Sequence, residues 1–236
     1  MKLKSRDIKK VCTVVAALFL LVTVHVASVY LFAVHRFTVI ADHRLSSTAV
    51  EHIEAFLSST DEHTALSMQA LAQKLKQHFG FLETVSCCQR ADGIVEVIVE
   101  QDAPFMLLNN GTMVLTKHNR IVSPQVYAAI KKEKLAICNV PLLSNEQQLP
   151  YDAFAYLRAI EKEILPGSTI DWQHRHTISF HPADRTIELI CNQEIKPSSQ
   201  LLDHCHHILS ESNWQKLRAD ARFDQQIIIS KLTSRR

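Results

Sequence analysis

The sequence predicts an α+β protein with an N-terminal transmembrane helix, a small β-α-α-β-β module and a mixed β domain with two or more helices. The first observation is an apolar run from Val11 to Val34, 24 residues without Lys, Arg, Asp or Glu. The second is a change of hydrophobic period that gives the order β-α-α-β-β before Pro104. The third is the strand-rich pattern of the remaining chain. With 47% hydrophobic and 21% charged residues, the chain has the composition of a folded protein.

Composition and motifs exclude several functions. The formal net charge is only +2, too small for a dedicated nucleic-acid binder. The 236 residues include only four glycines, and the GxGxxG, GxxxxGK[ST] and GxSxG motifs do not occur. The sequence therefore argues against the common nucleotide-binding folds and against a hydrolase nucleophile elbow.

The N-terminal end has the charge pattern of a cytoplasmic tail followed by a membrane anchor. At about 1.5 Å per residue, a helix of this length spans roughly 36 Å, enough for a hydrocarbon core of about 30 Å. A secretory signal has a shorter apolar region of about 7–15 residues, so we expect an uncleaved anchor, although Val26-Ala27-Ser28 could imitate a cleavage site. By the positive-inside rule, residues 1–10 stay in the cytoplasm and the chain after residue 34 crosses the membrane. Five basic residues carry this argument: Lys2, Lys4, Arg6, Lys9 and Lys10.

Residues 35–104 read as one small module, the plan of a POTRA domain. A β-like run from Phe37 to Ala41 precedes a helix in which Thr48 and Glu51 have capping-box spacing. A second helix starts near Ser67 and ends at Gly80. Two strands, Leu82 to Arg90 and Ile94 to Val99, are then joined by a turn containing Asp-Gly, which predicts a hairpin.

Residues 105–231 read as a β domain, followed by a short tail at 232–236. Asn109-Asn110-Gly111 predicts a hairpin between two β-like runs. Alternation from Thr169 to His181 predicts a strand with Trp172, His174, His176, Ile178 and Phe180 on one face, and Thr186 to Cys191 is its expected hairpin partner. Helices are expected at Pro150 to Leu165 and Ser198 to Asn213, and final strands at Ala219 to Phe223 and Gln226 to Leu232.

Three stretches resemble the FtsQ/DivIB family of bacterial cell-division proteins. Val85 to Pro104 (VSCCQRADGIVEVIVEQDAP) is similar to paired strands that end in a Val-x-Glu-x-x-Pro pattern. Phe105 to Val122 is similar to the hairpin and strand that follow it. The most specific match is the motif of Asp220, Arg222, Phe223 and Asp224, which resembles an Asp-x-Arg-Tyr-Asp motif near the end of the β domain. Asn119-Arg120, where a glycine is usual, and Ile190-Cys191, in place of Leu-Gly, depart from the family pattern.

The resemblance implies a non-catalytic protein without a cofactor, a divisome scaffold in the bacterial inner membrane at the septum. Family members bind the small bitopic coiled-coil proteins FtsB and FtsL and so support septal peptidoglycan synthesis. Their POTRA units contact other inner-membrane division proteins. By motif position, Phe223, Gln225 and Lys231 match family partner-contact sites, with Lys231 at a position where some members have an aromatic residue.

The last strand is the expected partner-binding site. A terminal strand is often an edge strand, and a long apolar edge needs a cover, which a partner provides by β-strand addition. The alternative is that the three isoleucines are core residues of a central strand. The expected partner-binding residues are Phe223, Gln225, Gln226, Ile227, Ile228, Ile229, Ser230 and Lys231.

Three rival functions stay open at this point. His204 and His207 share a helix face and could bind zinc with His174 or His176, although exposed histidines explain the pattern as well. A hydrolase or a POTRA-bearing component of another envelope machine is also possible in principle.

The five cysteines after the anchor are an odd number, which leaves at least one unpaired or paired between chains, and buried free thiols are the simplest expectation.

Overall fold

The structure is a computed structural model of the chain. It describes residues 15–24, 34, 36–59, 66–90, 92–130, 134–141, 147–163, 166–174, 176–223 and 226–232. These residues form an α+β fold, as predicted, in two compact units. The first unit takes its residues from 1–42 and 50–100, and the second from 43–49 and 101–236.

The described part of the predicted anchor is helical over residues 15–24. Among the residues that the structure describes, no helix is both long and apolar enough to cross a membrane. Most of the remaining residues from Val11 to Val34, together with the predicted tail at 1–10, lie outside the described residues.

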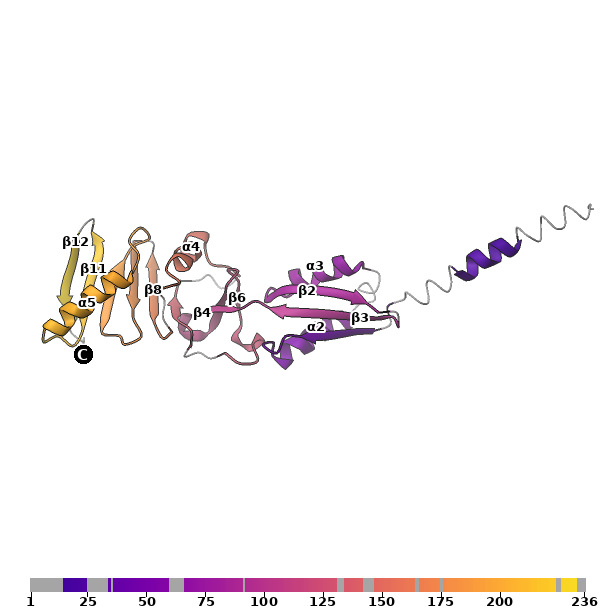
Figure 1. Ribbon diagram of the computed structural model, residues 1–236, viewed down its shortest axis with the longest axis horizontal. Helices are drawn as coiled ribbons and strands as arrows, with labels where there is room; N and C mark the ends of the chain where they lie inside the picture. Colours follow the sequence, from indigo (N-terminus) through magenta and orange to yellow (C-terminus); the bar gives the residue numbers. More distant parts are fainter. Residues whose placement is uncertain are drawn as a thin grey trace, which may run out of the picture. The chain divides into compact units, whose positions relative to one another are not determined.

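The first unit has the element order β-α-α-β-β and resembles a POTRA unit, as the sequence predicted. Its described strands form a three-stranded sheet in the order β1-β3-β2, with β1 parallel to β3 (Figure 1). The elements are β1 (Arg36–Ala41), α2 (Ser47–Ser58), α3 (Met68–His78), β2 (Leu82–Gln89) and β3 (Ile94–Gln101).

The core of this unit follows from period-2 alternation in β3. Val95, Val97 and Val99 are fully buried, whereas Ile98 and its partner in the register, Ile40, are 40% and 45% exposed. One face of the sheet is therefore packed and the other is open. The two helices complete the core with side chains that are at most 2% exposed: Ile53, Leu57, Leu71 and Leu75.

The helix starts show one wrong prediction. The Ala49 amide donates a hydrogen bond to Ser46 Oγ at 3.2 Å, so Ser46 caps α2, and Thr48 lies inside the helix instead of capping it. Ser46 has a side-chain hydroxyl, as Thr48 does, and lies one turn ahead of the apolar stripe. Sequence spacing alone therefore did not show which of the two residues is the N-cap. In α3, Ser67 accepts a hydrogen bond from the Ala70 amide, as expected of an N-cap residue.

The second unit is a mixed β domain with two α-helices among its described residues, as predicted. These residues form a nine-stranded sheet in the order β12-β11-β10-β9-β8-β7-β4-β5-β6 (Figure 1). The strands are β4 (Pro104–Leu108), β5 (Met113–Thr116), β6 (Ile121–Val122), β7 (Ile137–Asn139), β8 (Thr169–His174), β9 (Thr177–His181), β10 (Ile187–Cys191), β11 (Leu217–Phe223) and β12 (Gln226–Lys231), and the helices are α4 (Tyr151–Ala159) and α5 (Ser199–Glu211).

The predicted hairpin at Asn109-Asn110-Gly111 joins β4 to β5 through the short turn η2 (Asn109–Gly111). Asn109, Asn110 and Gly111 have φ values of 47°, 59° and 83°. Asparagine and glycine adopt this left-handed region more readily than other residues, which explains why they stand here. The same residue preference made the turn predictable from the sequence.

The prediction of one strand from Thr169 to His181 was wrong, because this stretch folds as the β8–β9 hairpin. Trp172 pairs with Ile178 and Ile170 with Phe180, so the apolar residues still share one face of the sheet. His176 lies in the turn. Alternation can continue in step through a tight turn, so the pattern does not distinguish one long strand from a hairpin. The expected partner, β10, pairs antiparallel with β9 as predicted.

The core of the second unit lies between the sheet and its two helices. Helix α4 buries Ala153, Tyr156 and Leu157, and the Tyr156 and Trp172 rings meet edge to face with centroids 5.3 Å apart. From α5 only Cys205 is fully buried, while Leu201, Leu202, Ile208 and Leu209 are partly buried against the same core. Helix α5 is therefore amphipathic. Its apolar face covers the sheet, and its other face lies in solvent.

The described cysteines are all free thiols in very different surroundings. Cys138, Cys191 and Cys205 are buried, Cys87 is half-buried and Cys88 is exposed. Burial raises the pKa of Cys138 and of Cys191 to about 12, and that of Cys87 to about 11. Because the thiolate is the reactive form, these thiols are protected both by burial and by protonation.

We expect a maleimide reagent to modify Cys88 far faster than the other described cysteines in the folded protein. The measurement is labelling followed by peptide mass spectrometry in a Cys12→Ser background, which removes the thiol outside the described residues. The Cys88→Ser variant is the control and should lose the fast phase. Rapid labelling of Cys138, Cys191 or Cys205 before unfolding would contradict the packing described above.

Candidate partner-binding edge strand

The last strand, β12, lies at one end of the nine-stranded sheet. Among the described residues it pairs with β11 alone, on one of its two sides (Figure 1). This confirms the expectation of an edge strand. The alternative, that Ile227 to Ile229 belong to a central strand, is wrong. Because β11 is held on its other side by β10, the hairpin is fixed to the sheet through β11.

The register shows which backbone groups of β12 point to the free edge. Leu217 pairs with Lys231 and Ala219 with Ile229, and the Leu232 amide donates to the directly opposite Lys216 carbonyl at 3.0 Å. In an antiparallel ladder, hydrogen-bonded and non-hydrogen-bonded pairs alternate. Ser230 and Ile228 therefore direct their N–H and C=O groups toward β11. The N–H and C=O groups that point outward belong to Ile227, Ile229 and Lys231.

The side chains of β12 put apolar surface on both faces of the sheet. Ile229 lies beside Ala219 and packs partly against the core, on the face that the helices cover. Ile228 lies on the opposite face, beside Asp220, and is 52% exposed. Ile227 and Phe223 are 42% and 47% exposed. An exposed run of this kind is unusual for a free edge, which natural proteins commonly protect with charges or proline.

A side-chain clasp holds the hairpin to the sheet. Arg222 donates from Nε to Asp220 Oδ1 at 2.9 Å and from Nη2 to Asp220 Oδ2 at 2.6 Å, a bidentate pair. Its Nη1 donates to Thr177 Oγ1 on β9 at 3.1 Å, so the guanidinium links β11 to a strand two positions away in the sheet. The β11–β12 register shifts between Asp220 and Phe223, at the residues that the clasp braces.

The electrostatics of the clasp favour the charged forms of both partners. Hydrogen bonding from the Arg222 side chain holds the pKa of Asp220 below its usual value, and the same pairing raises the pKa of Arg222. Asp220 and Arg222 have side chains only 16% and 34% exposed. Asp220 and Arg222 therefore have a structural role in this chain, because their pair braces the β-bulge that precedes β12.

The structure brings together most of the sequence-predicted partner-binding residues. Phe223 pairs with Gln226 across the hairpin, and Gln226, Ser230 and Lys231 are exposed along β12. Asp224 and Gln225 lie outside the described residues. The sequence did not reveal which of the three isoleucines turn their backbone outward, because that depends on the hydrogen-bonding phase of the ladder.

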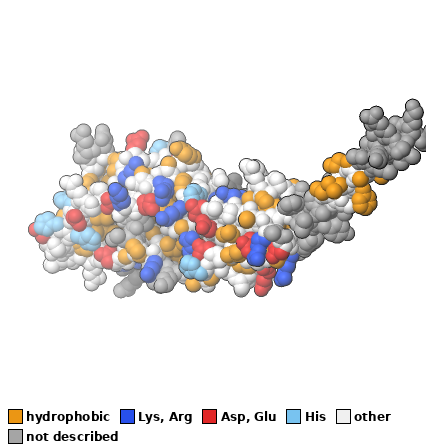
Figure 2. Space-filling model, turned by 45° about the vertical axis from the view of Figure 1, so that its right-hand side comes forward, with side chains coloured by type: hydrophobic (Ala, Val, Ile, Leu, Met, Phe, Trp, Pro, Cys, Tyr) orange, Lys and Arg blue, Asp and Glu red, His pale blue; other side chains and the backbone are white. Residues whose placement is uncertain are grey.

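The histidines of the rival zinc hypothesis do not converge with other ligands in the described part of the chain. His204 and His207 are exposed on α5, and Figure 2 shows exposed imidazoles on the surface of the second unit. His207 Nε2 lies 3.5 Å from Glu211 Oε1, one helical turn away. Among the described residues, no group of three or more potential metal ligands includes a histidine of α5. A zinc site needs three or four convergent ligands.

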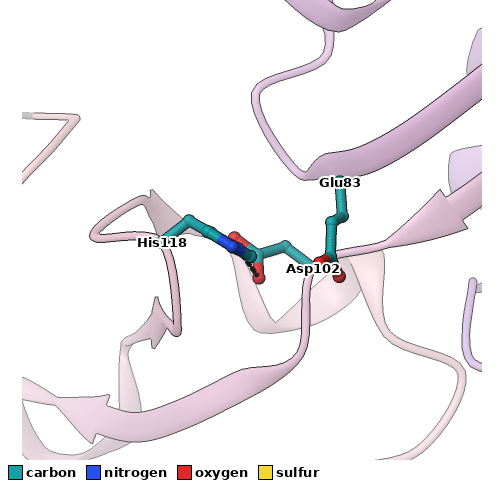
Figure 3. A group of neighbouring side chains, drawn as sticks. All are labelled: Glu83, Asp102 and His118. Atoms are coloured by element: carbon teal, nitrogen blue, oxygen red, sulfur yellow. Dashed lines mark hydrogen bonds and ion pairs between the residues drawn. The ribbon is translucent and has the colours of Figure 1, made fainter.

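Sequence reasoning missed a buried carboxylate at the start of the second unit. His118 Nδ1 lies 2.9 Å from Asp102 Oδ1 (Figure 3), and the Asp102 side chain is 1% exposed against 56% for His118. The Tyr127 hydroxyl donates to the Asp102 carbonyl at 2.9 Å. Asp102 and His118 are 16 positions apart and belong to no motif, so no sequence signal indicated the pair. Within the second unit, it ties the turn after β5 to the chain that enters β4.

The second unit also has an open pocket of about 360 Å³ at the carboxyl ends of the parallel strands β4, β7 and β8. Its polar side chains mostly brace one another. Asn139 donates to Asp171 Oδ1 at 2.6 Å and accepts from the Asn110 amide at 3.1 Å, while Asn109 accepts from the Val140 amide at 2.9 Å. These bonds explain the asparagines as loop supports, so the edge strand is the stronger candidate site.

Comparison with known proteins does not assign the chain to a family. No protein-family model matches the sequence, and no curated protein matches it at a significant level. The functional argument therefore depends on the edge strand and on the sequence pattern.

The clasp gives a prediction with a defined dependence on pH. Because the pKa of Asp220 is lowered in the folded state, its contribution to stability is complete above the unfolded pKa of about 3.9 and is lost as the pH falls through the folded value. We expect Asp220→Asn to lower the free energy of unfolding by roughly 1–2 kcal/mol at about pH 7, allowing for partial exposure of Arg222. The measurement is urea unfolding of both proteins across the acid range.

The difference between Asp220→Asn and wild type should shrink as the pH falls below about 4, because the Asp220 carboxyl of the unfolded wild-type chain then takes up a proton before that of the folded chain does. Arg222→Lys keeps the positive charge but loses the bidentate fork, and it should show an intermediate loss at neutral pH. A difference that stays constant down to the lowest pH would mean that the Asp220 carboxylate is not the group responsible.

Proposed function

We propose that the protein is a non-catalytic scaffold of the FtsQ/DivIB type. A single-pass anchor at residues 11–34 holds it in the bacterial inner membrane, with residues 1–10 in the cytoplasm. The POTRA-like unit and the β domain then lie outside the cytoplasm. Strand β12 captures an FtsB/FtsL-type bitopic division protein by β-strand addition and so supports septal peptidoglycan synthesis. The POTRA-like unit contacts other inner-membrane division proteins.

The observation that supports this proposal is the free edge of β12. Its outward N–H and C=O groups on Ile227, Ile229 and Lys231 form a template for one further strand. Exposed backbone of this kind gives affinity for an extended segment of almost any sequence. The isoleucines on the two faces then select which segment can pair, since apolar side chains beside them lose contact with water.

The anchor rests on a separate observation. The described helix at 15–24 exposes large apolar side chains, with Leu20 and Leu21 both 66% exposed. Exposure of so much apolar surface to water is unfavourable, whereas a lipid environment accommodates it. The uncharged run around this helix and the basic residues before it complete the pattern of a single-pass anchor.

We expect Ile227→Pro to reduce capture of the bitopic partner at least about tenfold, because proline removes an outward backbone donor and obstructs the added strand. The β11–β12 ladder should survive, since the Ile227 amide points away from β11. The measurement is recovery of a co-expressed FtsB/FtsL-type partner with the full-length chain, together with thermal unfolding of each variant.

Ile227→Ala is the matched control, because it shortens the same side chain and keeps the amide, so its effect should be clearly smaller. Ile228→Pro, which the sequence alone suggests as a test, would instead remove a donor that faces β11 and should destabilise the hairpin itself. Undiminished capture by a folded Ile227→Pro protein would exclude strand addition at this edge.

The anchor predicts retention of the full-length chain in the membrane fraction after alkaline carbonate extraction. Leu20→Arg combined with Leu21→Arg should release it, since each charge near the centre of a span costs about 2.5–3.5 kcal/mol on insertion scales. The matched control is Leu20→Val with Leu21→Val, which keeps the run apolar. Release of the wild-type chain by carbonate would refute a spanning anchor.

A further inference from the structure

The pocket at the carboxyl ends of β4, β7 and β8 has hydrogen-bonding groups that the fold leaves unused. Asn109 accepts a hydrogen bond from the Val140 amide through Oδ1, whereas its Nδ2 has no partner among the described residues. Gln173 also lines the pocket, and its exposed side-chain amide has no partner among the same residues. The pocket therefore offers both donors and acceptors to a ligand.

Asp171 supplies the one charge in the described lining of the pocket. Its Oδ1 accepts a hydrogen bond from Asn139 Nδ2 at 2.6 Å, and its Oδ2 lies 3.4 Å from His181 Nε2 on β9. These two contacts fix the orientation of the carboxylate. A carboxylate has about four acceptor sites, so Asp171, whose side chain is 37% exposed, can still accept an O–H or N–H group of a ligand.

The rest of the lining is apolar and consists of Trp172, Val140 and Pro141. Trp172 is only 8% exposed, and its ring meets the Tyr156 ring edge to face with centroids 5.3 Å apart. The core therefore holds this wall in place before any ligand arrives, which reduces the cost of ordering on binding. The volume of about 360 Å³ is near the lower end of the roughly 300–1,000 Å³ of small-molecule sites, so the pocket suits one or two small rings.

The composition of the lining argues against several classes of ligand. The described lining contains no Lys or Arg, so a phosphate or another strong anion finds no opposite charge. The single carboxylate already contacts an imidazole and an amide, which is too few free ligands for a divalent cation. A purely apolar ligand would leave the polar groups unpaired. These features favour a neutral ligand with an apolar face and several hydroxyl or amide groups.

We propose that this pocket binds a neutral glycan that carries N-acetylated sugars. A sugar ring has an apolar C–H face, which packs against Trp172, and hydroxyl groups at its edge, one of which pairs with the amide of Gln173. The acetamido N–H donates to Asp171, its carbonyl accepts from Asn109 Nδ2, and its methyl group contacts Val140. The site is separate from β12, so the inference does not depend on the proposed function.

The test is binding of the β-1,4-linked tetramer of N-acetylglucosamine to the full-length chain, in a detergent without a sugar headgroup. The sequence has two tryptophans, so a Trp214→Phe background leaves Trp172 as the sole reporter. The tetramer should give a saturable change in Trp172 fluorescence and saturation transfer to its acetyl methyl groups in NMR spectra. Cellotetraose has the same linkage but hydroxyls in place of the acetamido groups, and it should bind at least about fivefold more weakly.

Two variants test the assigned contacts. Asp171→Asn keeps the size of the side chain and an acceptor for Asn139, and it should weaken binding about tenfold or more because a charged acceptor is lost. Gln173→Ala should weaken binding about threefold or more, since it removes a neutral hydrogen bond at an exposed position. The matched controls, Asp203→Asn and Gln200→Ala, change exposed residues of α5 and should bind as the wild type does. Thermal unfolding establishes that each variant is folded.

Three results would overturn the inference: no saturable binding of the tetramer to the folded chain, equal affinity for cellotetraose, or unchanged affinity in both folded variants. Stronger binding of a neutral tripeptide blocked at both ends would also overturn it and would assign the pocket to peptides. The proposed function is tested separately, because Ile227→Pro should leave glycan binding unchanged. A chain that binds the glycan but captures no partner would support the inference and refute the proposed function, and the reverse result would refute only the inference.

Discussion

The half-satisfied backbone of β12 is the constraint on which the functional interpretation depends. Every second residue of an edge strand keeps its N–H and C=O groups outside the sheet, and here these residues are Ile227, Ile229 and Lys231. Water can satisfy the groups while the edge is free, but it cannot satisfy the isoleucine side chains beside them. A second strand would satisfy both, which is the physical basis of the proposed strand addition.

The fold can tolerate such an edge because its core does not depend on β12. On β11, Leu217, Ala219 and Ala221 are at most 3% exposed, whereas on β12 only Ile229 packs against the core. The Asp220–Arg222–Thr177 clasp ties β11 inward to β9. Stability thus comes mainly from the strands that precede β12. A strand added at the outer side of β12 would therefore leave the packing beneath the sheet unchanged.

The sequence predicted most of the elements but not their hydrogen-bonding phase. Alternation and turn residues predicted the hairpin at Asn109-Asn110-Gly111 and the β-α-α-β-β order, because these patterns are local. The terminal position of the last strand predicted its place at the edge of the sheet. They could not show that Thr169 to His181 folds back on itself. The outward set on β12 depends on a register that shifts between Asp220 and Phe223, and the Asp102–His118 pair depends on tertiary folding. These features depend on contacts between separate segments of the chain, and the periodicity within one segment does not indicate them.

Three consecutive isoleucines also restrict what can pair with the edge. A strand that covers one face of a sheet needs apolar residues only at alternate positions, but β12 exposes Ile227 on the helix-covered face and Ile228 on the open face. A complementary strand must therefore offer apolar side chains at adjacent positions, which an ordinary amphipathic surface strand lacks. Such a segment is poorly soluble as a free strand. The proposed bitopic partner would keep such a segment available because it is tethered beside the membrane.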